Sequence, residues 1–230
     1  MDSAQPRSDT RKLIAFTLPM AVFITLLGMT SSGNRPETAS WFSYPAYWIY
    51  PAQTVICGAL ILWFWRDYEL QAPRKVWFPV AIGLVVFAIW IAPQQFFGVG
   101  PRLSGFDPEV FEKGSTLYWA TVLLRFLRLV VIAPLVEEIF WRGFLLRYLI
   151  SEKFTMVTIG TFSWISFVVV TLVFGFAQSR ADWIAAFICG ALYNLVAYRT
   201  RSLASCAVAH ALTNLLLGLW IMQTRQWGFW

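Results

Sequence analysis

The chain alternates long apolar runs with short polar gaps. Most runs are near the roughly 20 residues that a helix needs to cross a bilayer. They cover residues 13–30, 46–65, 76–93, 116–150, 155–177, 182–198 and 203–223. This pattern predicts an all-α fold, a polytopic transmembrane helix bundle with seven spans. The fourth run is too long for one straight crossing and contains Pro134, so its division in two would give eight spans.

Composition and charge agree with a membrane protein. Of the 230 residues, 58% are hydrophobic and 13% are charged, whereas soluble domains have about 25% charged residues. The formal net charge is +6. Eleven of the eighteen Lys and Arg lie in the alternate gaps on the side of the N-terminus or, for Arg142 and Arg147, at the adjoining end of the fourth run, and five lie in the opposite gaps. Because cytoplasmic loops carry the cation excess, we expect the N-terminus inside, the C-terminus outside, contact with the lipid bilayer and no nucleic-acid partner.

Histidine and cysteine are too few and too scattered for a typical zinc site. The chain has one histidine, His210, and three cysteines within apolar runs, Cys57, Cys189 and Cys206. Zinc sites need a cluster of such residues, and a His-Glu-x-x-His metalloprotease needs two histidines on one helix. We therefore expect no metal and no other cofactor, and we expect the cysteines to pack in the core.

Two carboxylates and an arginine enter the fourth apolar run at Glu137, Glu138 and Arg142. On a helix, Glu138 and Arg142 are four residues apart and share a face, which favours an ion pair. Glu137 points about 100° away and is available as a general base. The same three residues also fit a purely structural salt-bridge cluster.

A second polar pair, His210 and Asn214, lies in the last run. Their spacing of four residues places an imidazole and a carboxamide on one face, where both can donate hydrogen bonds to a developing oxyanion. The pair equally fits a polar contact between two membrane helices. Counted from turns on the same membrane side, Glu137 and His210 lie at depths of about 22 Å and 15 Å, so we expect the two clusters to converge.

In their order and spacing, these motifs resemble the CAAX prenyl protease and bacteriocin-processing family, also called Abi, of glutamic-type intramembrane proteases. The resemblance rests on Glu-Glu-x-x-x-Arg at 137–142, Phe174 followed by Gln178, and His-x-x-x-Asn at 210–214. It implies a metal-independent endopeptidase in which Glu137 activates water, Arg142 holds Glu138, and His210 and Asn214 form the oxyanion hole. We expect one membrane domain over 1–230, with a catalytic core at 116–220 and accessory spans at 1–93.

One position departs from the family pattern. The family has Phe-x-x-x-His where this chain has Phe174 and Gln178. Glutamine can orient a water molecule but cannot take up a proton at neutral pH. By resemblance, Gln178 would belong to the catalytic group and Phe174 would contact substrate. Because Gln178 falls at the far end of its span, it reaches the site only if that span is short, tilted or bent.

Two functions remain open at this stage. The first is cleavage of a membrane-anchored protein or peptide. The second is binding of such a partner by a catalytically impaired member, as an immunity factor or a protein-sorting accessory. The compact chain, its short loops and the lack of an organelle signal favour a bacterial or archaeal plasma membrane, with a possible partner in a protein-sorting system.

Overall fold

The all-helical prediction is confirmed by a computed structural model, which describes residues 5–31 and 45–230. Its separate long helices are α1 (Gln5–Gly28), α2 (Pro45–Trp63), α3 (Trp77–Phe96), α7 (Trp164–Phe176), α8 (Trp183–Thr200) and α9 (Leu203–Thr224). A further continuous helix covers Thr116–Tyr148. Within the described residues, six helices are long and apolar enough to cross a membrane, and α7 is a shorter apolar helix.

The fourth apolar run forms one helix and does not divide at Pro134. It consists of α4 (Thr116–Leu127), α5 (Ala133–Glu138) and α6 (Leu146–Tyr148), joined by two π-helical segments, Arg128–Ile132 and Ile139–Leu145. A π segment fits an extra residue into a turn and often marks a functional site. Within the described residues this run is therefore one helix rather than two.

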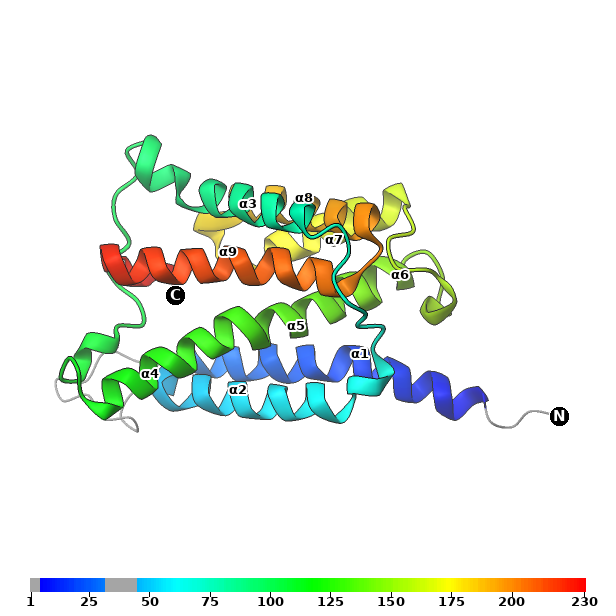
Figure 1. Cartoon of the computed structure of the whole chain (residues 1–230), viewed down its shortest axis with the longest axis horizontal. Coiled ribbons are helices and arrows are strands. Elements are labelled where there is room, and N and C mark those ends of the chain that lie inside the picture. The colour runs from blue at the N-terminus through cyan, green and yellow to red at the C-terminus, as the bar shows by residue number, and fades with distance from the viewer. Residues whose placement is uncertain (1–4, 32–44) are drawn as a thin grey trace.

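The helices form two groups with the long helix between them (Figure 1). On one side α1 packs on α2, and on the other α3, α7, α8 and α9 pack together. Small residues allow close approach in the second group: a Cβ atom added to Gly83 of α3 would lie 2.8 Å from the carbonyl oxygen of Ala209 in α9. Membrane helices commonly pack through such small residues. In Figure 1, α1 begins at the opposite end of the bundle from the end of α9, as an odd number of crossings requires.

The fifth span is shorter than the sequence predicted. Residues 155–177 were expected to be helical, but α7 begins only at Trp164. The Arg147 side chain donates to the backbone carbonyls of Phe154 and Val157 at 3.0 and 2.7 Å, which fixes this segment as a loop. Gly160 continues the loop with a φ of +76°, a conformation that glycine adopts without steric cost. An apolar pattern alone does not reveal such side-chain bonds to the backbone.

The loop between α3 and α4 packs against the bundle. Its Phe106 ring lies 4.7 Å from that of Tyr47 in α2, and Arg102 pairs with Asp182 at 2.6 Å. The loop is thus a packed connector in this structure. The cysteine prediction is also confirmed, since all three cysteines are free and buried.

Candidate active site

Glu138 is the centre of a buried polar cluster. Its side chain is almost completely buried, and its Oε1 atom lies 3.1 Å from Nη1 of Arg142 and 2.9 Å from Nδ1 of His210. The first contact is the ion pair that the spacing of four predicted. The second joins α5 to α9, so the two polar clusters converge as the depth comparison predicted. Glu138 Oε2 is buried without a hydrogen-bond partner.

Arg142 is held by three hydrogen-bond partners at once. Besides Glu138, its guanidinium donates to Oδ1 of Asn194 at 3.0 Å and to the carbonyl oxygen of Gly190 at 3.1 Å, both in α8. Asn194 in turn donates to the hydroxyl of Thr171 in α7 at 3.1 Å. These bonds orient the planar guanidinium, as second-shell contacts orient functional groups elsewhere. Sequence reasoning missed Asn194 and Thr171, although each is a polar residue inside an apolar run.

Glu137 differs from its neighbour. Its side chain is only partly buried, and within the described residues it has neither an ion pair nor a hydrogen bond. The charged groups that act on its carboxylate are those of His210, Glu138, Arg142 and Arg128. As their helix positions predicted, Glu138 is ion-paired, whereas Glu137 has no ion pair within the described residues.

His210 is oriented from two sides. Its ring stacks on Tyr193 of α8 with centroids 5.1 Å apart, and its Nδ1 atom faces Glu138. An ionised carboxylate only accepts hydrogen bonds, so this contact places a proton on Nδ1. Nε2 is then the ring atom left for another partner. Sequence reasoning had assigned His210 to an oxyanion hole without finding its bond to Glu138.

Asn214 has a bond that the motif did not suggest. Its Nδ2 atom donates to the carbonyl oxygen of Leu129 at 2.9 Å. In the π register of this segment, Ala133 N–H bonds to the carbonyl of Arg128, five residues earlier. Pro134 would be the next donor, to Leu129, but proline has no N–H. Asn214 therefore satisfies a carbonyl that Pro134 leaves free, with one amide N–H still available.

The two residues of the α7 motif differ in their contacts. Phe174 is buried, its ring lying 5.7 Å from that of Trp141 and 5.1 Å from Cζ of Arg142. Its observed contacts are thus with the cluster itself. Gln178 lies beyond the end of α7, where its backbone carbonyl accepts from Trp183 Nε1 at 3.2 Å. Within the described residues its side chain makes no hydrogen bond, so a catalytic role for Gln178 stays a prediction.

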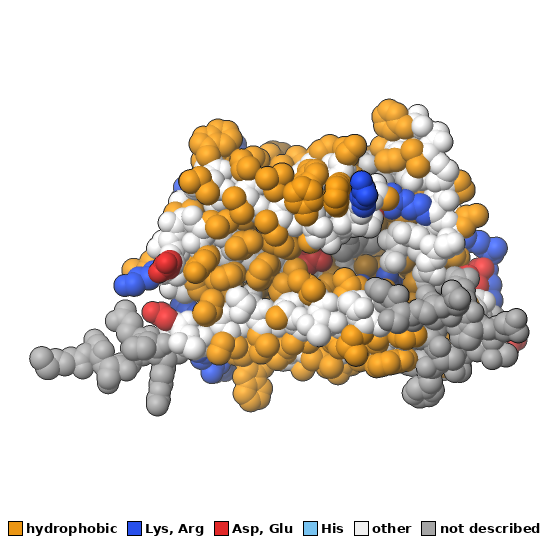
Figure 2. All heavy atoms as spheres, turned by 180° about the vertical axis from the view of Figure 1, so that it is seen from behind, with side chains coloured by type: hydrophobic (Ala, Val, Ile, Leu, Met, Phe, Trp, Pro, Cys, Tyr) orange, Lys and Arg blue, Asp and Glu red, His pale blue; other side chains and the backbone are white. Residues whose placement is uncertain are grey.

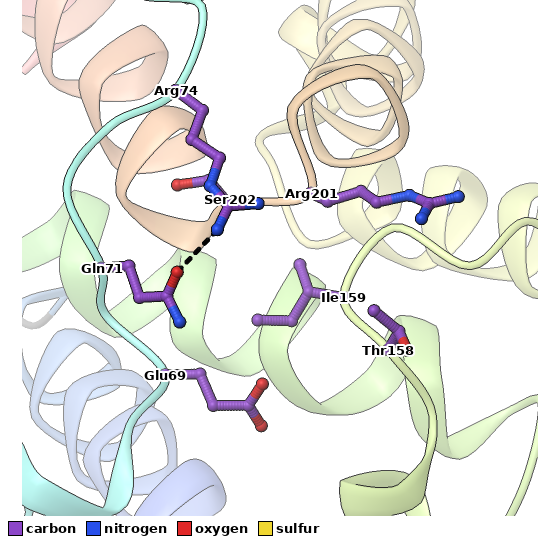
Figure 3. A pocket seen from close by; sticks show the side chains of 7 residues that line it. All are labelled: Glu69, Gln71, Arg74, Thr158, Ile159, Arg201 and Ser202. Carbon is purple, nitrogen blue, oxygen red and sulfur yellow. Dashed lines mark hydrogen bonds between the residues drawn. The ribbon is translucent and has the colours of Figure 1, made fainter.

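The molecule has a surface hollow (Figure 2) and a separate cavity, and they differ in the residues that line them. Seen from behind, the surface has a hollow between the two groups of helices, with an acidic side chain visible inside it (Figure 2). A separate cavity of about 240 Å³ lies near the ends of several helices (Figure 3). Two of its charged lining residues are already paired: Glu69 with Arg147 at 3.0 Å, and Arg74 with Gln71, also in the lining, at 2.8 Å. That cavity contains none of the motif residues.

The described residues contain no group of three or more His, Cys, Asp and Glu side chains placed to hold a metal ion. The polar cluster instead joins two carboxylates, one guanidinium and one imidazole. This set can hold a water molecule, move a proton and donate hydrogen bonds to an oxygen that gains negative charge.

Comparison with known proteins identifies the same part of the chain. Residues 118–216 match the family described as type II CAAX prenyl endopeptidase Rce1-like. No curated protein and no solved structure matches. The matched segment contains Glu137, Glu138, Arg142, His210 and Asn214, so the resemblance inferred from the motifs is confirmed there. This segment of the chain is therefore similar to CAAX prenyl endopeptidases.

Proposed function

We propose that this protein is a glutamic-type intramembrane endopeptidase that cleaves a membrane-anchored protein or peptide without a metal. The observation that carries the proposal is the contrast between the two adjacent glutamates. Glu138 is fixed by Arg142 and His210, whereas Glu137 lies beside it, partly exposed and unpaired among the described residues. A carboxylate that acts as a general base must be held in place by its neighbours, and its oxygen atoms must not be occupied by an ion pair.

In the proposed reaction, the Glu137 carboxylate takes a proton from a water molecule, and the resulting hydroxide attacks the scissile carbonyl carbon. The carbonyl electrons move to oxygen, which becomes an oxyanion. Glu137 then returns the proton to the leaving nitrogen as the C–N bond breaks. Each proton is accounted for, and no step needs a redox partner.

The oxyanion would be stabilised by His210 and Asn214. His210 Nε2 would donate to the oxyanion when the ring carries both protons. Asn214 retains one N–H beyond its bond to Leu129. Phe174, packed against Arg142, would act as a positioning residue rather than as part of an open substrate surface.

One observation favours the second candidate, a protein that binds peptides without cleaving them. The side chain of Gln178 makes no hydrogen bond to the cluster within the described residues, and glutamine cannot handle a proton. Such a protein would act as an immunity factor or a sorting accessory. For either function we propose a bacterial or archaeal plasma membrane and a partner in a protein-sorting system.

The direct test compares cells that contain the wild type, Glu137→Ala, or no protein, using proteomics of new C-terminal ends in the membrane fraction. We expect new ends that depend on the wild type and disappear with Glu137→Ala. Glu109→Ala, in the loop before α4, is the matched control and should retain them. An identical set of ends in all four samples would reject the protease and favour peptide binding.

A further inference from the structure

A second group of buried charges lies in the same long helix, nearer its start. Arg125 and Arg128 are 3% and 5% exposed, and each guanidinium is close enough to act on the other. Within the described residues neither has an ion pair with a carboxylate. Buried arginines in a membrane protein are costly and usually have an anionic partner or a function.

The contacts of this pair leave hydrogen-bond donors unused. Arg128 Nε donates to the side-chain oxygen of Gln53 in α2. Arg125 lies over the ring of Tyr50, with Cζ 3.9 Å from the centroid, but its Nε and Nη1 atoms have no hydrogen-bond partner. Aromatic rings attract a cation through their faces and leave most of its N–H donors unsatisfied.

Another buried polar group without a hydrogen-bond partner, the Thr121 hydroxyl, lies on the same helix face as Arg125. Thr121 precedes Arg125 by one turn, and its buried hydroxyl also has no partner. Spacings of four and three residues place Thr121, Arg125 and Arg128 along one stripe of the helix. The hydroxyl of Thr121 and the free Nε and Nη1 donors of Arg125 match the two oxygen atoms of a carboxylate, which accepts paired hydrogen bonds from arginine, and Arg128 adds a second positive charge.

The stripe ends at Arg128, and Glu137 lies further along the same helix. Arg128 precedes Glu137 by nine residues, which is about 13 Å of helix at ~1.5 Å per residue, and its charge acts on the Glu137 carboxylate. An extended peptide advances ~3.3 Å per residue. A substrate with its scissile bond at Glu137 would therefore reach the arginines about four residues away.

We propose that Thr121, Arg125 and Arg128 form a subsite for a carboxylate of the peptide substrate. This inference rests on the proposed function, because Glu137 marks the position of the scissile bond. The carboxylate is either the terminal group of the peptide or an Asp or Glu side chain near that position. Phe106 and Trp230, whose rings lie 5.0 and 5.8 Å from Cζ of Arg125, cover the subsite from segments outside the spanning helices.

The test measures binding rather than cleavage, so it remains valid if no peptide is cut. Full-length Glu137→Ala protein in lipid nanodiscs is titrated with a fluorescent, N-palmitoylated octapeptide of alanine and leucine. Three forms are compared: a free carboxylate, a C-terminal carboxamide, and a carboxamide with Asp as the last residue. We expect the free acid to bind at least tenfold more tightly than the carboxamide. Tight binding of the Asp form would assign side-chain carboxylates to the same subsite.

Substitutions then show which residues cause the preference for a peptide with a free carboxylate. Arg125→Gln and Arg128→Gln should each reduce the acid-to-amide ratio toward one, and Arg125→Lys, which keeps the charge, should retain part of it. Arg225→Gln is the control, since Arg225 is an exposed arginine after α9. A purely structural role for Arg125 would lower the melting temperature of Arg125→Gln without changing the ratio. That result, or equal binding of all three peptides, would overturn the proposal. If Arg125→Gln does not fold, the acid-to-amide ratio of Arg128→Gln is the deciding measurement.

Discussion

Nδ1 of His210 lies 2.9 Å from Oε1 of Glu138, and this contact joins the last helix of the bundle to the helix that carries both glutamates. Arg142 binds the same oxygen atom at 3.1 Å. Glu138 therefore links two cationic or potentially cationic groups in a buried position. Its neighbour Glu137 has no such bond, so the two glutamates should respond differently to substitution.

Glu138→Gln should destabilise the protein, because it leaves the buried charge of Arg142 without its partner. The expected loss is about 3–5 kcal/mol of unfolding free energy, as found when one member of a buried ion pair is removed. Thermal or denaturant unfolding in detergent measures it. Glu137→Gln should change stability little and reduce cleavage by about a hundredfold or more.

The double variant Glu138→Gln with Arg142→Met is the control for this comparison. It removes the unpaired charge, so part of the lost stability should return. A double variant as unstable as the sum of its two single variants would contradict the ion-pair explanation.

Asn214→Leu should destabilise the long helix by leaving the carbonyl of Leu129 unsatisfied. An unsatisfied buried acceptor costs about 1–3 kcal/mol. Pro134→Ala restores a backbone N–H that can bond to this carbonyl, so the double variant should lose less stability than the two single variants together. A double-mutant cycle of unfolding free energies measures the difference, and simple additivity would mean that Asn214 does not act through Leu129.

Gln178→His tests whether the missing histidine limits activity. Because the side chain at position 178 follows the end of α7 and makes no hydrogen bond to the cluster within the described residues, we expect less than a tenfold change in cleavage rate. A gain within the hundredfold to ten-thousandfold range of acid-base catalysis would instead indicate that α7 moves toward the site when substrate binds. Rates on one peptide, for the wild type and this variant, distinguish the two outcomes.

Gly160→Ala should destabilise the loop before α7. The residue has a φ of +76°, and an added Cβ atom would lie 2.2 Å from the carbonyl oxygen of Ala197 in α8. We expect a loss of at least about 1 kcal/mol, since both backbone strain and a steric clash result. Gly100→Ala is the matched control, because a Cβ atom there meets no other atom within 4 Å. Equal melting temperatures for the two variants would argue against the close contact.

Compartment-sensitive reporters at the two ends test the orientation. With seven crossings and the observed cation distribution, a reporter before α1 should respond from the cytoplasm and one after Trp230 from the opposite side. Two reporters on the same side would require an even number of crossings.

Several features could be predicted from the sequence because they depend on distance along a helix. The apolar runs gave six of the seven helix positions to within a few residues, apart from an earlier start to α1. The spacing of Glu138 and Arg142 predicted their ion pair, and distance from the turns predicted that Glu137 and His210 approach one another. Rise and rotation per residue fix these relationships before any packing is known.

Only the tertiary structure decided which groups meet across helices. The rotation of α9 about its axis brings His210 into contact with Glu138. The π segment at Arg128–Ile132 leaves the carbonyl of Leu129 to accept a hydrogen bond from Asn214. Bonds from Arg147 to the backbone of the preceding loop accompany the late start of α7 at Trp164. Each outcome depends on the rotation and register of one helix against another, which close packing and the satisfaction of buried polar groups determine.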